Sequence, residues 1–218
     1  MASKRKAPNL NKDIDASLSK AGIPHTEREI YRVNPGRFLK AIKKGKKANK
    51  SGWMVDVHTK AEYAKMKCYL TADGQSGICV TKDGDVVSLF SRSKEKNAMG
   101  KLIPFAVAHG GRKLDCYANG LQNMYARYGA KAIAQTPFNV DYAPDDWDGT
   151  STNPVVAMTL PSSIAEIIRV YDGDARADIS KAKEFADKEN GYGQMKAYRD
   201  KKMSQKTSGV NGMALSAT

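Results

Sequence analysis

In the first third of the chain, apolar residues have helical spacing in some segments and strand-like patterns in others. Apolar side chains at positions 38, 39 and 42 share one helical face, which predicts a short amphipathic helix near 36–47. The β-branched run WMVDVH at 53–58 predicts a strand. A capping-box pair, Thr59 and Glu62, precedes AEYAKMKCYL at 61–70, so we expect a helix there. Proline and glycine interrupt residues 1–25, which predicts a loose arm.

The clearest local pattern is a hairpin. Asp83-Gly84 separates two β-branched runs, GICVTK and DVVSLFS, and both turn positions of such a hairpin favour a positive φ. Residues 94–108 predict a polar loop that opens a helix, and Pro104 requires a late start or a kink. A strand, a helix and another strand are then expected in turn at 112–117, 121–128 and 131–136.

The last third begins with PVVAMTL at 154–160, which predicts a final strand. Residues 163–203 have helical composition in two pieces, and we expect Gly191 and Gly193 to break the second piece. From Thr207 onward the small and polar composition predicts a disordered end.

This order of elements predicts a mixed α/β (α+β) fold. An antiparallel hairpin that leads into a βαβ crossover is typical of a mixed sheet with helices on both faces. We expect three regions: a basic N-terminal arm with a short helix at 1–50, a central domain at 51–161, and a helical C-terminal extension at 162–218. The length of 218 residues suits one domain with such tails.

The formal net charge of +13 is concentrated at one end of the chain. Residues 1–50 hold 14 basic and 4 acidic side chains, whereas residues 51–150 hold 12 and 11. Such a basic region can contact the phosphates of nucleic acid, and the candidate contacts are Lys43, Lys44, Lys46 and Lys47. The alternative is a solvated helix face, because no aromatic residues interleave with these lysines.

Several classes of protein are disfavoured by the sequence. No apolar run approaches the roughly 18 residues that a membrane span needs. The basic N-terminus has no apolar segment behind it, so we expect no secretory signal and a cytoplasmic location. The three cysteines, Cys68, Cys79 and Cys116, have no CxxC spacing, and we expect small buried hydrophobes in a reducing compartment. His25 and His109 lack ligand partners at useful spacing, so no metal cofactor is expected.

Two side chains in the expected strand–helix–strand segment are candidates for chemistry. Asp115 is an acid inside a short apolar strand, where desolvation must be offset by a partner or retained for function. It is either a base that deprotonates an amine or a structural group that caps a helix or pairs with Arg112. Tyr125, next to apolar neighbours on its helix, is by pattern alone a core aromatic.

The stretch RKLDCYANGLQNMYARYGAKAIAQTPF at 112–138 resembles the second half of the GNAT superfamily of N-acyltransferases. In that family a strand leads to a helix with Asn and a Leu-Tyr-x-x-x-Gly-Phe type ending, followed by another strand. Here Tyr125 and Gly129 reproduce the spacing, and Ala130 stands where the family has Phe. The Lys113-Leu-Asp and Pro137-Phe-Asn segments are similar to a GNAT-like branch met in bacteriophage and mobile-element proteins. The resemblance covers residues 53–160.

The resemblance implies transfer of an acetyl or other acyl group from its coenzyme A thioester to an amine of an unidentified acceptor. It implies Tyr125 as proton donor to the departing thiolate, and Asp115 is a candidate base. The strand at 85–91 is expected to diverge from the strand at 112–117 and to offer backbone groups to the pantetheine arm. The cofactor contacts implied are Leu89, Phe90 and Ser91 on the strand, Asn97, Met99, Gly100 and Lys101 at the pyrophosphate loop, and Asn119 and Asn123 on the later helix.

The pyrophosphate loop departs from the family pattern. The family has Gln/Arg-x-x-Gly-x-Gly/Ala, because side chains there collide with a pyrophosphate that approaches the backbone. This chain has a single glycine in KEKNAMGK at 94–101, where three lysines supply positive charge. The alternative is a non-catalytic GNAT-fold protein, for example a virion component, whose basic N-terminal region binds nucleic acid or a partner protein.

Overall fold

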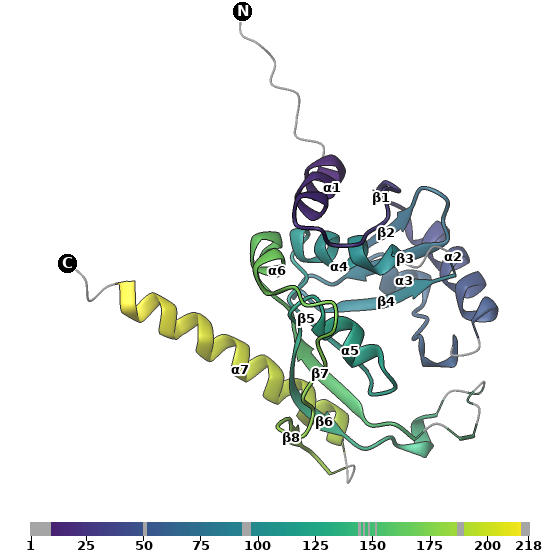
Figure 1. Cartoon of the computed structure of the whole chain (residues 1–218). Helices are drawn as coiled ribbons and strands as arrows, with labels where there is room; N and C mark the ends of the chain where they lie inside the picture. The colour runs from purple at the N-terminus through teal and green to yellow at the C-terminus, as the bar shows by residue number, and fades with distance from the viewer. Residues whose placement is uncertain are drawn as a thin grey trace, which may run out of the picture. The chain divides into compact units, whose positions relative to one another are not determined.

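A computed structural model describes the chain as two compact units (Figure 1). The described residues are 10–49, 52–92, 97–143, 145, 147, 149–150, 152–186 and 190–214. The first unit comprises Met1–Gly111 and Ser162–Tyr171, and the second comprises Arg112–Pro161 and Asp172–Thr218. The predicted mixed α/β class is confirmed, because both units combine helices with a four-stranded sheet. The strands that were expected in one central sheet at 51–161 belong to two sheets instead, one on each side of the Gly111/Arg112 division.

The sheet of the first unit is antiparallel throughout. Its strands follow one another in chain order, β1 (Ile30–Arg32), β2 (Lys67–Thr71), β3 (Ser76–Val80) and β4 (Val86–Ser91). The predicted hairpin joins β3 and β4, and Gly84 in its turn has φ +83°. That value is costly for a residue with a Cβ, which explains glycine at this position.

Helices cover the faces of this sheet (Figure 1). Asn34 accepts a hydrogen bond from the Arg37 amide at 2.9 Å and starts α2 (Pro35–Ala48), as the 36–47 pattern predicted. The apolar face of α2 packs against β2, β3 and β4 through Phe38 and Ile42. The remaining elements of this unit are α1 (Leu10–Lys20), the 3-10 helix η1 (Gly52–Met54), α3 (Lys60–Tyr63), α4 (Ala98–Ala108) and α6 (Ile164–Val170).

Two predictions between residues 53 and 70 were wrong. The expected strand at 53–58 is instead η1 followed by irregular backbone. The expected helix at 61–70 ends at Tyr63, and β2 begins at Lys67. The capping box is present, but Cys68 and Leu70 are buried in the sheet between β1 and β3. Strand pairing on both sides of β2 thus prevails over helical spacing.

The N-terminal region is part of the first unit, where a loose arm was expected. In α1, the side chains of Ile14 and Leu18 are completely buried. Both α1 and α2 therefore belong to the body of the unit, so the expected boundary near residue 50 does not separate an arm from a domain. Residues 1–9, including the basic cluster at 4–6, lie outside the described part of the chain.

The sheet of the second unit has the order β5 (Lys113–Tyr117), β7 (Val155–Thr159), β6 (Lys131–Thr136), β8 (Lys183–Glu184). β7 lies antiparallel between β5 and β6, and β8 is parallel to β6. Helix α5 (Leu121–Ala126) connects β5 to β6, as the sequence predicted. The segment between β6 and β7 contains a short 3-10 helix, η2 (Val140–Tyr142).

The last helix, α7 (Gly191–Ala214), begins where glycines were expected to break it. A Cβ at position 191 would lie 2.6 Å from the Ala186 carbonyl oxygen, so glycine permits the close approach that starts the helix. The side chain of Met195 is completely buried against Ala134 and Ala157 of the sheet. The helical backbone continues to Ala214, so residues 207–214 of the predicted disordered end are helical, and residues 215–218 lie outside the described part of the chain.

Candidate functional site

A β-bulge in β4 is the most unusual backbone feature of the first unit. The β3–β4 register shifts between Gly77 and Cys79, and Ser88 on β4 has φ +53°. The Ser88 hydroxyl donates to the Asp56 carbonyl at 3.1 Å and lies 3.0 Å from the Tyr63 hydroxyl, from which it accepts. These bonds hold a residue in a backbone conformation that L-amino acids rarely adopt.

The predicted pantetheine-binding residues follow this bulge. β4 is the last strand of its sheet and pairs with β3 alone among the described strands. An edge strand has unpaired backbone groups along its outer side, which is what a β4 contact with pantetheine requires. Ser91 Oγ lies 2.7 Å from Ser76 Oγ, and Leu89 is half-buried. The Phe90 side chain packs in the core 5.8 Å from the Phe38 ring, and its backbone pairs with Gly77 of β3.

The N-terminus of α4 is the predicted pyrophosphate site. The N-cap residue, Asn97, is exposed and makes no side-chain cap hydrogen bond. The Gly100 amide of the first turn donates to the Asn97 carbonyl at 3.0 Å. The amides of Ala98 and Met99 precede it in this turn, and first-turn amides together with the helix dipole favour an anion. Met99 is half-buried in this turn. Two of the loop lysines, Lys94 and Lys96, lie outside the described residues.

The last two predicted loop contacts have structural partners instead. A Cβ on Gly100 would collide with the Pro24 carbonyl oxygen, so this glycine allows α4 to approach the segment before β1. The Lys101 side chain is completely buried, and its Nζ lies 2.7 Å from Asp15 Oδ1 and 2.8 Å from Asp15 Oδ2. This ion pair joins α4 to α1. The expected contact of Lys101 with pyrophosphate is therefore corrected to a contact with Asp15.

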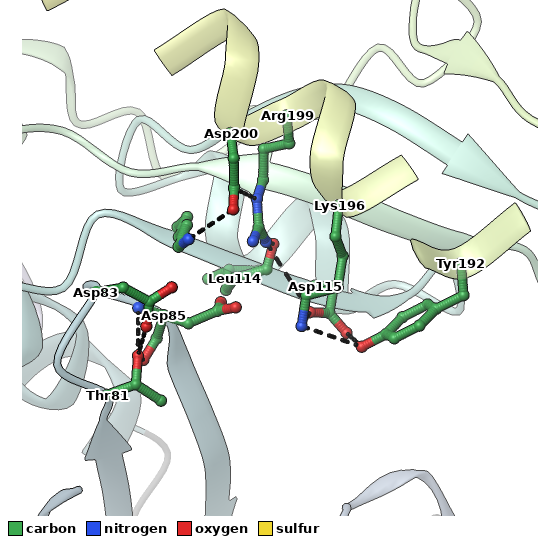
Figure 2. A network of polar contacts seen from close by, with 10 residues as sticks. Thr81, Asp83, Asp85, Leu114, Asp115, Tyr192, Lys196, Arg199 and Asp200 are labelled. Atoms are coloured by element: carbon green, nitrogen blue, oxygen red, sulfur yellow. Dashed lines mark hydrogen bonds and ion pairs between the residues drawn. The ribbon is translucent and has the colours of Figure 1, made fainter. Parts of the chain in front are cut away.

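In the second unit, Asp115 on β5 is bound by residues of α7 (Figure 2). The Tyr192 hydroxyl donates to Asp115 Oδ2 at 2.9 Å, and Lys196 Nζ lies 3.6 Å from Oδ1. The sequence left a base and a structural partner open as alternatives for Asp115. The structure provides structural partners on α7 that the sequence did not identify.

The same helix contributes a buried arginine. Arg199 is completely buried and donates through Nη1 to the Leu114 carbonyl at 3.0 Å and through Nε to Asp200 Oδ1 at 2.9 Å. Lys113 Nζ donates to the other Asp200 oxygen at 2.8 Å. A buried guanidinium needs such partners, because its desolvation is costly. The sequence signal for this group is the helical spacing of the polar residues at 192, 196 and 199.

Tyr125 on α5 is buried. Burial raises its pKa well above the usual value, with further contributions from the nearby Cys116 and Asp115. The phenol is therefore protonated at neutral pH, as a proton donor must be. Asn123 accepts a hydrogen bond from the Ala177 amide at 3.0 Å, and Asn119 lies in the turn before α5. Asn123 thus has a structural partner, whereas the expected contact of Asn119 with the cofactor stays a prediction.

The predicted nucleic-acid contacts lie on α2. Lys43, Lys44 and Lys47 are exposed, and Lys46 is half-buried. The opposite face of α2, with Phe38 and Ile42, is part of the core. The lysines are therefore a solvated face of a packed helix, and not a flexible link.

Comparison of the chain with models of protein families, with curated proteins and with solved structures finds no match. Among the described residues, no helix is both long enough and apolar enough to cross a membrane.

Proposed function

We propose that this protein is a GNAT-like N-acyltransferase that transfers an acetyl group from acetyl-CoA to an amine. One observation carries the proposal: a bulged edge strand, β4, is followed along the chain by the N-terminus of α4, where Asn97 makes no side-chain cap hydrogen bond. This succession combines unpaired backbone groups for an amide-rich pantetheine arm with helix amides for a pyrophosphate. The resemblance of residues 112–138 to GNAT proteins supports acyl transfer to an amine as the class of reaction.

The chemistry has three requirements. The acyl carbonyl must be polarised, the attacking amine must be neutral, and the departing thiolate must take up a proton. In the proposal Tyr125 gives that proton, and its raised pKa keeps the proton available at neutral pH. Tyr125 belongs to the second unit, so its role rests on the resemblance together with this pKa. Asp115 is the candidate base, in competition with its structural role beside Tyr192.

Fewer residues contact the acyl donor, acetyl-CoA, in this proposal than the sequence suggested. The proposal keeps the Leu89 backbone, the Asn97 side chain, and the Ala98 and Met99 amides of α4 as contacts. The side chains of Phe90, Lys101 and Asn123 have other partners, and Gly100 serves the packing of α4. A cytoplasmic location fits three free cysteines, because disulfides are rare in that reducing compartment.

Calorimetry with CoA and acetyl-CoA tests the proposal. Saturable binding to the full-length protein is expected, and Asn97→Asp should weaken it by about tenfold because a carboxylate at the N-cap repels pyrophosphate. Asn34→Asp makes the same charge change at the N-cap of α2 and should leave binding unchanged. Absence of binding to the wild-type protein contradicts the proposal, and equal affinities of the two variants contradict the α4 site.

A second candidate function, nucleic-acid binding without catalysis, is favoured by the exposed lysines of α2. Phosphate contacts of this kind release counterions, so binding must fall steeply with salt. Changing Lys43, Lys44 and Lys47 to Gln should abolish DNA or RNA binding at moderate salt. The control changes the exposed Lys65, Lys82 and Lys201 to Gln. If both triple variants bind as the wild-type protein does, α2 is not the contact surface.

A further inference from the structure

The structure brings together two cysteines that are eleven positions apart in sequence. β2 and β3 pair antiparallel with Cys68 directly opposite Cys79. Opposite residues in such a ladder have Cα atoms about 4.5–5.5 Å apart. Disulfides span Cα separations of about 4.4–6.8 Å. The register alone therefore places this pair within the range of a covalent cross-link.

The two side chains also point toward each other. Cys79 Sγ lies 2.6 Å from Cys68 Sγ, and a disulfide bond is about 2.04 Å long. Both thiols are buried in the core cluster with Phe38, Tyr63 and Phe90. Closure of the bond thus needs a small movement of the sulfur atoms and no change of strand register.

We propose that Cys68 and Cys79 are a redox modification site that closes to a cross-strand disulfide on reaction with a low-molecular-weight disulfide such as oxidised glutathione. The inference does not depend on the acyltransferase proposal. It changes the expectation from the sequence, in which all three cysteines were small buried hydrophobes. Cys116 lies in the second unit and serves as an internal control.

The reaction balances through two exchanges. The thiolate of one cysteine attacks a sulfur of the external disulfide, whose S–S bond breaks, and one small thiolate leaves with the bonding electron pair. The other cysteine, as thiolate, then attacks the protein sulfur of this mixed disulfide and expels the second small thiolate. The two cysteines lose two protons and two electrons, and one external disulfide becomes two thiols.

The environment of the pair distinguishes its two members. Hydrogen bonding from Cys79 lowers the pKa of Cys68, and burial raises the pKa of Cys79. Both strands are interior, with β1 on one side and β4 on the other, so a bulky oxidant reaches the thiols only when the sheet opens.

The experiment therefore forms the bond during folding. The full-length protein is refolded from denaturant in a buffer of oxidised and reduced glutathione, quenched, denatured and labelled with a maleimide. One labelled thiol is expected, Cys116, and reduction should restore all three. Trypsin leaves both cysteines in one peptide, 68–82, which should lose the mass of two hydrogen atoms. In non-reducing buffer the unfolding midpoint should rise by about 5 °C.

Two variants provide the controls. Cys116→Ser should still lose its two remaining thiols to the bond and show the same rise of the midpoint. Cys79→Ser should keep two labelled thiols and show no such rise. The proposal is overturned if the refolded wild-type protein keeps three thiols, or if peptide 68–82 carries glutathione in place of an internal bond.

Discussion

Asp200 has its carboxylate held between two cations. Burial raises the pKa of Asp200, but hydrogen bonds from Lys113 and Arg199 outweigh it, and the pKa lies below its ordinary value of 3.8. A lowered pKa stabilises the folded protein at every pH above the unfolded value of about 4. The stabilisation is lost as the pH falls through the folded pKa. Acid should therefore weaken the attachment of α7.

We predict that Asp200→Asn lowers the free energy of unfolding at pH 7 by about 1 kcal/mol, a modest value because water screens a side chain that is 44% exposed. The loss relative to wild type should shrink toward pH 2, where the wild-type carboxylate is protonated. Urea unfolding at both pH values measures this, with the exposed Asp174→Asn as control. A constant difference between pH 7 and pH 2 contradicts the linkage.

Tyr125 is the residue on which the proposed chemistry depends most. We predict that Tyr125→Phe slows acetyl transfer by about 100-fold, because the phenol proton is lost, while CoA affinity is unchanged. Because burial raises the pKa of Tyr125, the wild-type rate should not fall between pH 7 and pH 9 through ionisation of this group. Tyr128→Phe is the control at another buried tyrosine. Transfer at the wild-type rate by Tyr125→Phe excludes this role.

The sequence indicated that single residues such as Asp115 and Lys101 are unusual, but it did not identify the residues that contact them. Asp115 was recognised as an acid that needs a partner, and it has one in Tyr192, 77 positions away. Lys101 was assigned to phosphate because neighbouring lysines suggest it, yet it pairs with Asp15 across 86 positions. Such contacts depend on the tertiary arrangement, which local patterns do not contain.

Helix α2 offers a matched pair of glycines for testing its packing. A Cβ at Gly45 would lie 2.5 Å from the Phe90 ring, whereas one at Gly36 would meet only ordinary contacts at 3.5 Å or more. We predict that Gly45→Ala lowers the free energy of unfolding by about 2 kcal/mol through overpacking. Gly36→Ala should raise it by about 0.5 kcal/mol through helix propensity. The denaturant midpoints of the two variants measure these changes. Equal effects of Gly45→Ala and Gly36→Ala would contradict the close packing of Gly45 against Phe90.

The elements that the sequence predicted well are those with local determinants. The β3–β4 hairpin has Asp-Gly in its turn, and α2 has a capping Asn, a following Pro and one apolar face. The elements that it missed depend on distant pairing. β2 has helical spacing, but its backbone hydrogen bonds are made to β1 and β3. α7 begins at glycines because its first turn approaches Ala186 and packs on β6 and β7.

The two units of the molecule can be probed separately. Ile167 of α6 and Met195 of α7 are both completely buried, one in each unit. We predict that Ile167→Ala lowers the amide hydrogen-exchange protection of β2 and β3, because α6 packs on α4 of that unit. Met195→Ala should lower the protection of β6 and β7 instead. Equal losses in both sheets from either variant would contradict two cooperative units.

The division of the chain into two units could not be predicted from its composition. Net charge separates the first 50 residues from the rest, but burial of α1 and α2 makes their described residues part of the first unit. Residues 162–171 also return to this unit after β5, β6 and β7 of the second unit and before its β8. Neither charge nor hydrophobic periodicity predicts that a late segment packs in an earlier unit, because this packing depends on the assembled core.

Because residues 162–171 belong to the first unit, this unit is completed only after most of the second has been synthesised on the ribosome. The first unit lacks α6 until Tyr171 has been added, and the segment Arg112–Pro161 emerges before it. At about 10 residues per second, roughly fifty residues take about five seconds to make. During this interval the surface of α4 on which α6 packs is not covered by α6. The nascent chain is therefore most prone to misfolding and chaperone capture between the synthesis of β5 and that of α6.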